Sequence, residues 1–213
     1  MRYIDLQTWP RREHFKIYKD FDLPHFSLCA NVDLTSFYPA VKQGSYPVTT
    51  AIVYVLARVA NTISEFRYRI RAGQVIEHDV VHPSMTILTR DDLFSFCTFN
   101  YFENFQEFAA RAAERIDYIQ KHPTLEDEPG QDNLLFMTSI PWVSFTGLMH
   151  PLHLQPADSV PRIAWGKFFD DSGSKKMPLS VQVHHALMDG IHVGKFYSEV
   201  QNILDHPDLV LGE

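Results

Sequence analysis

Two adjacent histidines followed by an aspartate and a glycine are the residues best suited to chemistry in this chain. His184 and His185 end a strand-like run, and Asp189 and Gly190 follow at once. A neutral imidazole is the usual general base near neutral pH. Because neighbouring strand residues face opposite sides, Val183 and His185 share one face and His184 the other. Only one histidine of the pair can therefore face a given cleft.

Asp189 and Gly190 fit the start of a helix. An aspartate there accepts hydrogen bonds from free backbone N–H groups, and glycine permits a close backbone approach. A nearby helix N-terminus favours a neutral imidazole, which can accept a proton. Taken alone, however, a histidine pair before a turn is more typical of two ordinary histidines than of a catalytic site. We predict no metal site, because the paired rings diverge and His192 belongs to no HExxH pattern.

The elements that must position this segment mix strands and helices without a regular βαβ rhythm. Pro47 opens an apolar helix that ends near Ser64, and 104–120 predicts an amphipathic helix. A third helix is expected from Asp189 to about Asp205. Strands are expected over 26–34, 66–70, 74–78, 84–89, 93–98, 134–139, 162–169 and 177–184, with a hairpin turn over 170–176 and an acidic surface loop over 125–130. The pattern predicts an α/β fold with a mixed sheet in a single domain, residues 1–213.

Composition excludes several classes of protein. The chain has 213 residues, 45% of them hydrophobic, enough for a large core. Its net charge of −7 provides no broad basic surface for nucleic acid. Cys29 and Cys97 are far apart and are expected to be reduced thiols. The first 30 residues contain no apolar run, and Ala51 to Ala57 is too short to cross a membrane, so we expect a cytoplasmic protein without a signal peptide.

Three further sequence motifs indicate the family to which the histidine motif belongs. His184 to Gly190 matches the HHxxxDG motif of CoA-dependent acyltransferases. Trp9 to Phe15, Ile140 to Phe145 and Pro178 to His185 resemble signatures of the chloramphenicol acetyltransferase family (type A), in the same order. The resemblance covers nearly the whole chain. It implies a two-layer sandwich in which helices cover a mixed β-sheet.

The resemblance also implies roles for the motif residues. His185 would be the base that deprotonates a substrate hydroxyl as it attacks the thioester of acetyl-CoA. Asp189 would be structural, paired with Arg11. Thr138 would donate a hydrogen bond to the oxyanion, where the family has a serine. Ser139 is the alternative donor, and we prefer Thr138.

The remaining implied roles concern ligands. Tyr18 and Phe26 would contact the acceptor, and Lys167 the CoA phosphates, with Lys175 or Lys176 as weaker candidates. Ala164 stands where a familiar member has a threonine that helps to bind water. His184 and Trp142 are expected to be structural. An aromatic group that could wall the acceptor pocket, although core packing fits it equally well, comprises Phe94, Phe96, Phe99, Tyr101 and Phe102.

The family assembles as a trimer with active sites at subunit interfaces. By resemblance, His185 would come from one subunit and Tyr18 and Thr138 from its neighbour. The expected activity is acetylation of the 3-hydroxyl of chloramphenicol by acetyl-CoA, without a metal. Two alternatives stay open: an acetyltransferase of the same fold with another hydroxyl acceptor, and a non-catalytic ligand-binding relative.

Overall fold

The computed structural model describes residues 1–126 and 130–212. Its strands are β1 (Arg2–Tyr3), β2 (His25–Asp33), β3 (Tyr68–Arg71), β4 (Gln74–Glu77), β5 (His82–Leu88), β6 (Phe94–Thr98), β7 (Leu134–Ile140), β8 (Arg162–Gly166), β9 (Phe169–Asp171) and β10 (Ser174–His184). Its helices are α1 (Arg12–Tyr18), α2 (Phe37–Gln43), α3 (Val48–Thr62), α4 (Phe105–Lys121), α5 (Gly190–Asp205) and α6 (Asp208–Leu211). Part of the acidic loop expected over 125–130, residues 127–129, lies outside the described residues.

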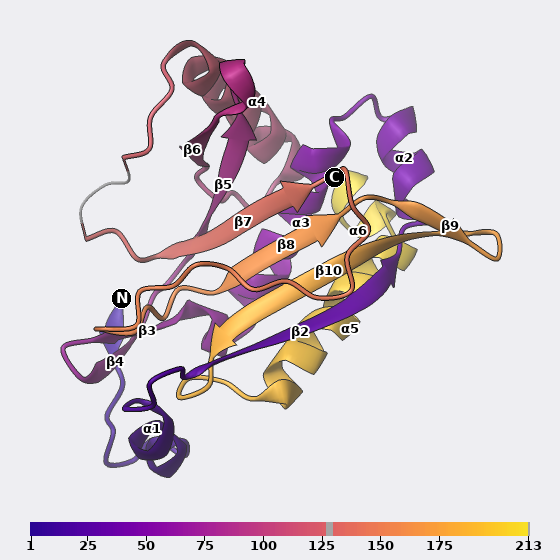
Figure 1. The fold of residues 1–213 in the computed structure, drawn as a ribbon. Helices are drawn as coiled ribbons and strands as arrows, with labels where there is room; N and C mark the ends of the chain where they lie inside the picture. The colour runs from indigo at the N-terminus through magenta and orange to yellow at the C-terminus, as the bar shows by residue number, and fades with distance from the viewer. Residues whose placement is uncertain (127–129, 213) are drawn as a thin grey trace.

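A large mixed sheet forms one layer and the helices form the other (Figure 1). The strands lie in the order β2-β10-β8-β7-β5-β6, and β9 pairs with the far end of β10. The pairs β5–β7 and β7–β8 are parallel, and the others are antiparallel. This arrangement confirms the predicted α/β sandwich with a mixed sheet.

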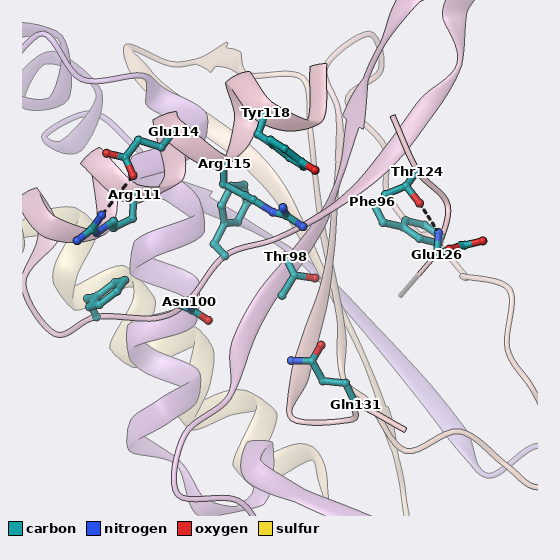
Figure 2. A pocket seen from close by; sticks show the side chains of 12 residues that line it. Phe96, Thr98, Asn100, Arg111, Glu114, Arg115, Tyr118, Thr124, Glu126 and Gln131 are labelled. Atoms are coloured by element: carbon teal, nitrogen blue, oxygen red, sulfur yellow. Dashed lines mark hydrogen bonds and ion pairs between the residues drawn. The ribbon is translucent and has the colours of Figure 1, made fainter. Parts of the chain in front are cut away.

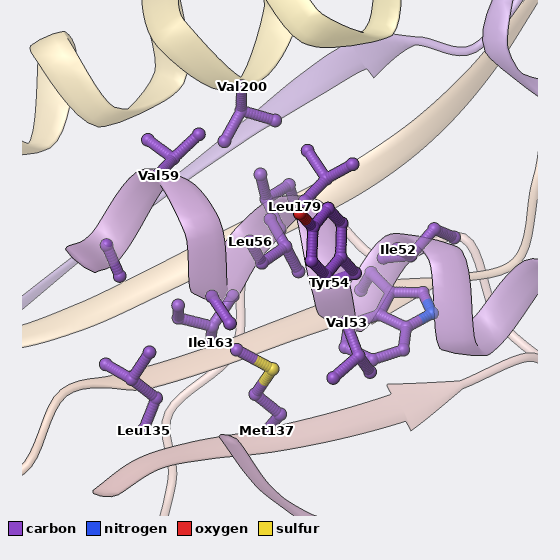
Figure 3. Close-up of a cluster of buried hydrophobic side chains, with 14 of the residues drawn as sticks. Ile52, Val53, Tyr54, Leu56, Val59, Leu135, Met137, Ile163, Leu179 and Val200 are labelled. Atoms are coloured by element: carbon purple, nitrogen blue, oxygen red, sulfur yellow. The ribbon is translucent and has the colours of Figure 1, made fainter. Parts of the chain in front are cut away.

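Helix α3 is the centre of the core. Ten of its fifteen residues are buried, because it lies between the sheet, α4 and α5. Leu56 and Val59 pack toward the sheet and α5, where they meet Ile163, Leu179 and Val200 (Figure 3). Burying each such aliphatic side chain contributes about 1.5–3 kcal/mol. The apolar surface expected of this helix is therefore satisfied on nearly all sides.

A small second sheet, in the order β1-β4-β3, closes the end of the molecule where β10 stops (Figure 1). It encloses a separate apolar cluster that includes Trp9, Tyr68, Ala186 and Leu187. Ala186 and Leu187 belong to the turn that follows β10, and both are at most 1% exposed. The small sheet and the N-terminal segment thus hold the histidine-bearing turn from outside.

Two strand predictions need correction. The strand expected over 66–70 is preceded by a 3-10 turn, Ser64–Arg67, because Phe66 enters the main core and stacks on Phe196 at 4.7 Å. The strand expected over 162–169 breaks after Gly166. The backbone of Val143 lies so close to Gly166 that a Cβ atom at position 166 would be 2.6 Å from the Val143 carbonyl oxygen. The Lys167 N–H donates to the same oxygen at 2.9 Å.

A long segment without helices or strands, residues 141–161, crosses the face of the sheet opposite the helices (Figure 1). Its backbone is held by side chains of the sheet. Ser27 donates to the Leu148 carbonyl at 3.1 Å, and Gln182 accepts from the His150 N–H at 2.9 Å. We refer to this face of the sheet as the outer face.

Candidate active site

His185 occupies the first position after β10. Its backbone N–H donates to the Pro24 carbonyl at 2.7 Å, and its Nδ1 lies 3.2 Å from the Met188 carbonyl oxygen. Because a carbonyl can only accept, Nδ1 carries the proton. Nε2 of the neutral ring is then bare and able to take a proton. This tautomer is the one a general base requires.

Two aromatic rings hold the His185 imidazole. Tyr18 stacks on it with ring centroids 4.0 Å apart and planes 15° apart, and Phe26 lies at 4.9 Å. The His185 side chain is still 32% exposed, so the ring is confined but accessible. The two predicted acceptor residues thus lie beside the predicted base. The expectation that Tyr18 faces His185 across a subunit boundary is wrong, because the two rings stack on each other within a single chain.

An ion pair ties α1 to the turn after β10. The Arg11 guanidinium donates to both carboxylate oxygens of Asp189, with Nη2 to Oδ1 at 3.0 Å, and also to the His185 carbonyl at 3.0 Å. The hydrogen bond from Arg11 lowers the pKa of Asp189, which opens α5 as its N-cap residue. Asp189 Oδ1 also lies 3.2 Å from His185 Nδ1. The carboxylate therefore contacts both Arg11 and the His185 ring.

His184 points into the outer face and is 2% exposed. Its Nδ1 accepts from the Ala186 N–H at 3.2 Å, and its ring lies edge-on to His25 at 5.0 Å. His150 of the crossing segment is also largely enclosed. Each of these three histidines has one buried ring nitrogen without a hydrogen-bond partner: His25 Nδ1, His150 Nε2 and His184 Nε2. The pair thus divides as strand geometry predicts, with His185 partly accessible and His184 buried.

Thr138 lies far from His185 of the same chain. On β7 it pairs with Ala164 of β8, which pairs with Ser180 of β10. Ser180 precedes His185 by five residues, roughly 16 Å of strand, and two strand spacings add about 10 Å across the sheet. Thr138 and His185 of one chain therefore cannot touch the same reacting atom.

Lys167 and Ser139 line a crevice of about 320 Å³ where β7 and β8 end beside the start of α3. Val48, Thr49 and Trp165 also line it. Thr138 does not, because its side chain faces the outer side of the sheet. Lys175 and Lys176 instead pair with Asp170 and Asp171 in the β9–β10 hairpin.

The aromatic group expected around an acceptor divides between two surroundings. Phe99 is 4% exposed and joins the core, whereas Phe94 is 51% exposed. Phe96, Phe99 and Phe102 line a hollow of about 700 Å³ between β6 and α4, which Arg115 and Thr98 also enter (Figure 2). Thr98 donates to Ser84 at 2.9 Å, and Ser84 pairs with Phe136, two residues before Thr138. Thr98 and Thr138 therefore share the outer face.

Sequence reasoning missed three residues near the turn. His25 and His150 give no local signal, because their burial depends on the fold of distant segments. His192 does give one, since it stands three residues after the N-cap Asp189, where a side chain can reach back to the N-cap amide. Its Nδ1 accepts from the Asp189 N–H at 2.9 Å. Within 1–126 and 130–212, no group of three His, Cys, Asp or Glu side chains could hold a metal ion, and no helix is long and apolar enough to cross a membrane.

Comparisons with known proteins agree with this geometry. The family model described as "Chloramphenicol acetyltransferase" matches residues 1–201. The chain belongs to the chloramphenicol acetyltransferase family. It is 32% identical to "Chloramphenicol acetyltransferase 2" of Escherichia coli over 206 residues, 95% of this chain and 96% of the relative. Membership makes it an acyltransferase.

Solved structures extend the likeness to the fold. A chloramphenicol acetyltransferase structure superposes with a TM-score of 0.87 at 26% identity, covering 96% of this chain and all of the other. The cubic core of a pyruvate dehydrogenase multienzyme complex reaches a TM-score of 0.70 at 18% identity, covering 89% and 84% of the two chains. The second likeness shows a shared fold.

The buried histidines predict acid sensitivity. Burial, reinforced by neighbouring positive charge, lowers the pKa of His184 and of His150 to about 4, and burial lowers that of His25. Below about pH 6.5 these histidines become protonated in the unfolded chain, whereas His184 and His150 of the folded chain stay neutral until about pH 4. The free energy of unfolding therefore falls across that interval. Each histidine contributes up to about 1.4 kcal/mol per pH unit to the loss.

We predict that His184→Asn makes the fall in unfolding free energy between pH 6.5 and 4.5 shallower. Asparagine keeps an acceptor for the Ala186 N–H and does not titrate. Chemical denaturation at several pH values measures the slope, and the exposed His14→Asn serves as the matched control. An unchanged slope in His184→Asn would contradict the assignment.

Proposed function

We propose that this enzyme transfers the acetyl group of acetyl-CoA to the 3-hydroxyl of chloramphenicol and so inactivates the antibiotic. The observation that carries the proposal is the His185 ring, whose Nδ1 is held by the Met188 carbonyl and whose Nε2 is left bare. A base of this form, in a chain of this family, suits deprotonation of a hydroxyl. General base catalysis of this kind contributes about 10²–10⁴-fold to the rate.

The proposed reaction is one direct transfer. His185 Nε2 takes the proton of the acceptor hydroxyl while the oxygen attacks the thioester carbonyl carbon. The tetrahedral intermediate collapses by breaking the carbon–sulfur bond, and the leaving thiolate of CoA takes the proton back from the imidazolium. The ester and free CoA are the products, and the chain carries no acyl group at any stage.

The oxyanion donor in this proposal is Thr138 of a neighbouring subunit. Thr138 lies too far from His185 of its own chain, which supports a site shared between two copies. Its side chain also faces the same side of the sheet as Thr98, which enters the aromatic hollow proposed for the acceptor. Tyr18 and Phe26 then belong to the subunit that supplies the base, and the hollow belongs to its partner.

A homotrimer is the proposed assembly. The crossing segment 141–161 exposes large apolar side chains that a single chain leaves uncovered, among them Trp142 at 68% and Met149 at 66%. Trp142 is thus outside the core of its own chain, and its structural role would be at an interface. Exposed apolar side chains gathered on one face are typical of protein interfaces.

The proposed co-substrate, acetyl-CoA, suits the crevice at the ends of β7 and β8. Lys167 supplies a cation there, and the crevice also borders the first residues of α3. A helix N-terminus together with a lysine favours phosphate groups. Because acetyl-CoA is a metabolite of the cytoplasm, the proposal includes a cytoplasmic location.

Two residues favour an acceptor other than chloramphenicol. Thr138 carries an extra methyl group beside the proposed oxyanion, and Ala164, paired with it, cannot hold water by a hydroxyl. Both changes alter the surroundings of the acceptor and leave His185 intact. An acetyltransferase of the same mechanism acting on another small hydroxyl compound is therefore the alternative.

The first prediction tests the activity. The wild-type protein should release free thiol from acetyl-CoA when chloramphenicol is added, and His185→Ala should lower kcat by about 10³-fold or more with little change in Tm. A spectrophotometric thiol assay measures both. Turnover of another hydroxyl compound alone would overturn the acceptor, and full activity of His185→Ala would overturn the mechanism.

The second prediction separates the two candidate oxyanion donors. Thr138→Ala should lower kcat by about 10²-fold, whereas Thr138→Ser should keep most of it, because the hydroxyl is the group that acts. Ser139→Ala is the matched control and should change kcat little. The reverse ranking of the two alanine variants would assign the role to Ser139.

The third prediction tests the shared site. Chains with His185→Ala and chains with Thr138→Ala should each be strongly impaired alone. Co-expressed, they should regain activity, because a mixed trimer contains interfaces at which both residues are native. Differently tagged chains allow mixed trimers to be purified and assayed, and inactivity of those trimers would show that each site lies within one chain.

A further inference from the structure

One peptide group, between Met188 and Asp189, is hydrogen-bonded to an imidazole at each end. Its carbonyl oxygen lies 3.2 Å from His185 Nδ1, and its N–H donates to His192 Nδ1 at 2.9 Å. Because a peptide group is planar, its two ends cannot turn independently. A side chain that fixes the N–H therefore also fixes the carbonyl that orients His185.

The outer nitrogen of His192 faces a carboxylate. Because Nδ1 accepts a hydrogen bond, the neutral ring carries its proton on Nε2. Nε2 lies 3.4 Å from Glu65 Oε1, and the two side chains are only 21% and 23% exposed. Glu65 thus favours the tautomer in which Nδ1 is an acceptor. Successive contacts therefore link Glu65 to His192, His192 to the Met188–Asp189 peptide group, and this peptide group to His185.

The other contacts of the turn leave this peptide to His192. Arg11 holds the Asp189 carboxylate and the His185 carbonyl, and Pro24 accepts the His185 N–H. Ala186 and Leu187 are fixed by apolar packing. Of the groups around the turn in the described structure, His192 is the one whose side chain bonds to the Asp189 N–H.

We propose that His192 is a positioning residue for His185, which it orients through the Met188–Asp189 peptide, and that Glu65 holds His192 in the tautomer required. The proposal rests on the proposed function in that His185 is the base. It assigns His192 no contact with substrate. Without the acceptor at His192 Nδ1, the peptide can rotate and the Met188 carbonyl is no longer held toward His185 Nδ1, which is left with Asp189 Oδ1, an oxygen that also accepts from Arg11.

Two substitutions distinguish the nitrogens of His192. Asparagine places its Oδ1 where Nδ1 stands, so His192→Asn keeps the acceptor for the Asp189 N–H and loses the group facing Glu65. Leucine resembles asparagine in shape but has no acceptor, so His192→Leu loses the hydrogen bond from the Asp189 N–H. His192→Ala removes both nitrogens. His206→Asn, at the other end of α5, is the matched control, since the His206 side chain contacts the Asn202 carbonyl and, within the described residues, does not contact the turn.

We expect His192→Leu and His192→Ala to lower kcat by about 10-fold or more with KM nearly unchanged, because a misplaced base loses rate and leaves binding intact. His192→Asn should stay within about threefold of wild type. If the three variants lost activity only through a less stable helix, the asparagine variant would lose it as well. If His192→Asn is as inactive as His192→Leu, or if all three variants keep full activity, the proposal is wrong.

A substrate-free readout separates this proposal from the proposed function. Long-range proton–nitrogen NMR spectra distinguish a bare from a protonated ring nitrogen, and His185→Ala identifies the His185 signals. Wild type, His192→Asn and His206→Asn should give the same His185 Nδ1 and Nε2 signals, and His192→Leu and His192→Ala should give shifted signals, because the Met188 carbonyl no longer holds the Nδ1 proton. Wild-type protein that transfers no acetyl group would overturn the proposed function, and these spectra would then decide the positioning role. Identical His185 spectra in all variants would overturn it.

Discussion

The ion pair between Arg11 and Asp189 is the constraint on which the rest of the site depends. It joins the first helix to the start of α5 across 178 positions of sequence, and the same guanidinium also holds the His185 carbonyl. The Arg11 side chain is only 11% exposed, so the pair is partly withdrawn from water. Removing one partner of such a pair leaves the other charge poorly solvated, which costs more than the net value of the pair itself. The turn is therefore fixed by a contact that is strongly unfavourable to break.

Around that ion pair, the two sheets have different tasks. The large sheet brings β10 to its end at His184 with a strand that is buried from Met177 onward, so the position of His185 inherits the rigidity of the main core. The small sheet adds a separate apolar cluster beneath Ala186 and Leu187. Tyr18 and Phe26 then restrict the ring itself. A base that is held on several sides loses little orientational entropy when the reaction begins.

Much of this arrangement could be predicted, because it is encoded locally. Strand alternation separates His184 from His185, and the Asp-Gly pair marks the start of α5. The break after Gly166 could not be predicted, since it depends on Val143 approaching from a segment without regular structure. The same holds for Phe66, whose turn is set by a distant Phe196. The resemblance predicts that Tyr18 and His185 come from different subunits, and this is wrong. A sequence motif does not tell which copy of the chain a side chain faces.

The order of the strands along the chain has a consequence for biosynthesis. The edge strand β2 is made early, yet its partner in the sheet, β10, is the last of the described strands to be made, and Asp189 follows it. During translation Arg11, Tyr18 and Phe26 must therefore wait, without their final neighbours, until almost all of the polypeptide has left the ribosome. Other strands of the large sheet, such as β5, β7 and β8, can pair among themselves before then. The end of the molecule that carries His185 is thus assembled last, and a ribosome that stalls before β10 is complete releases a chain in which this end cannot form.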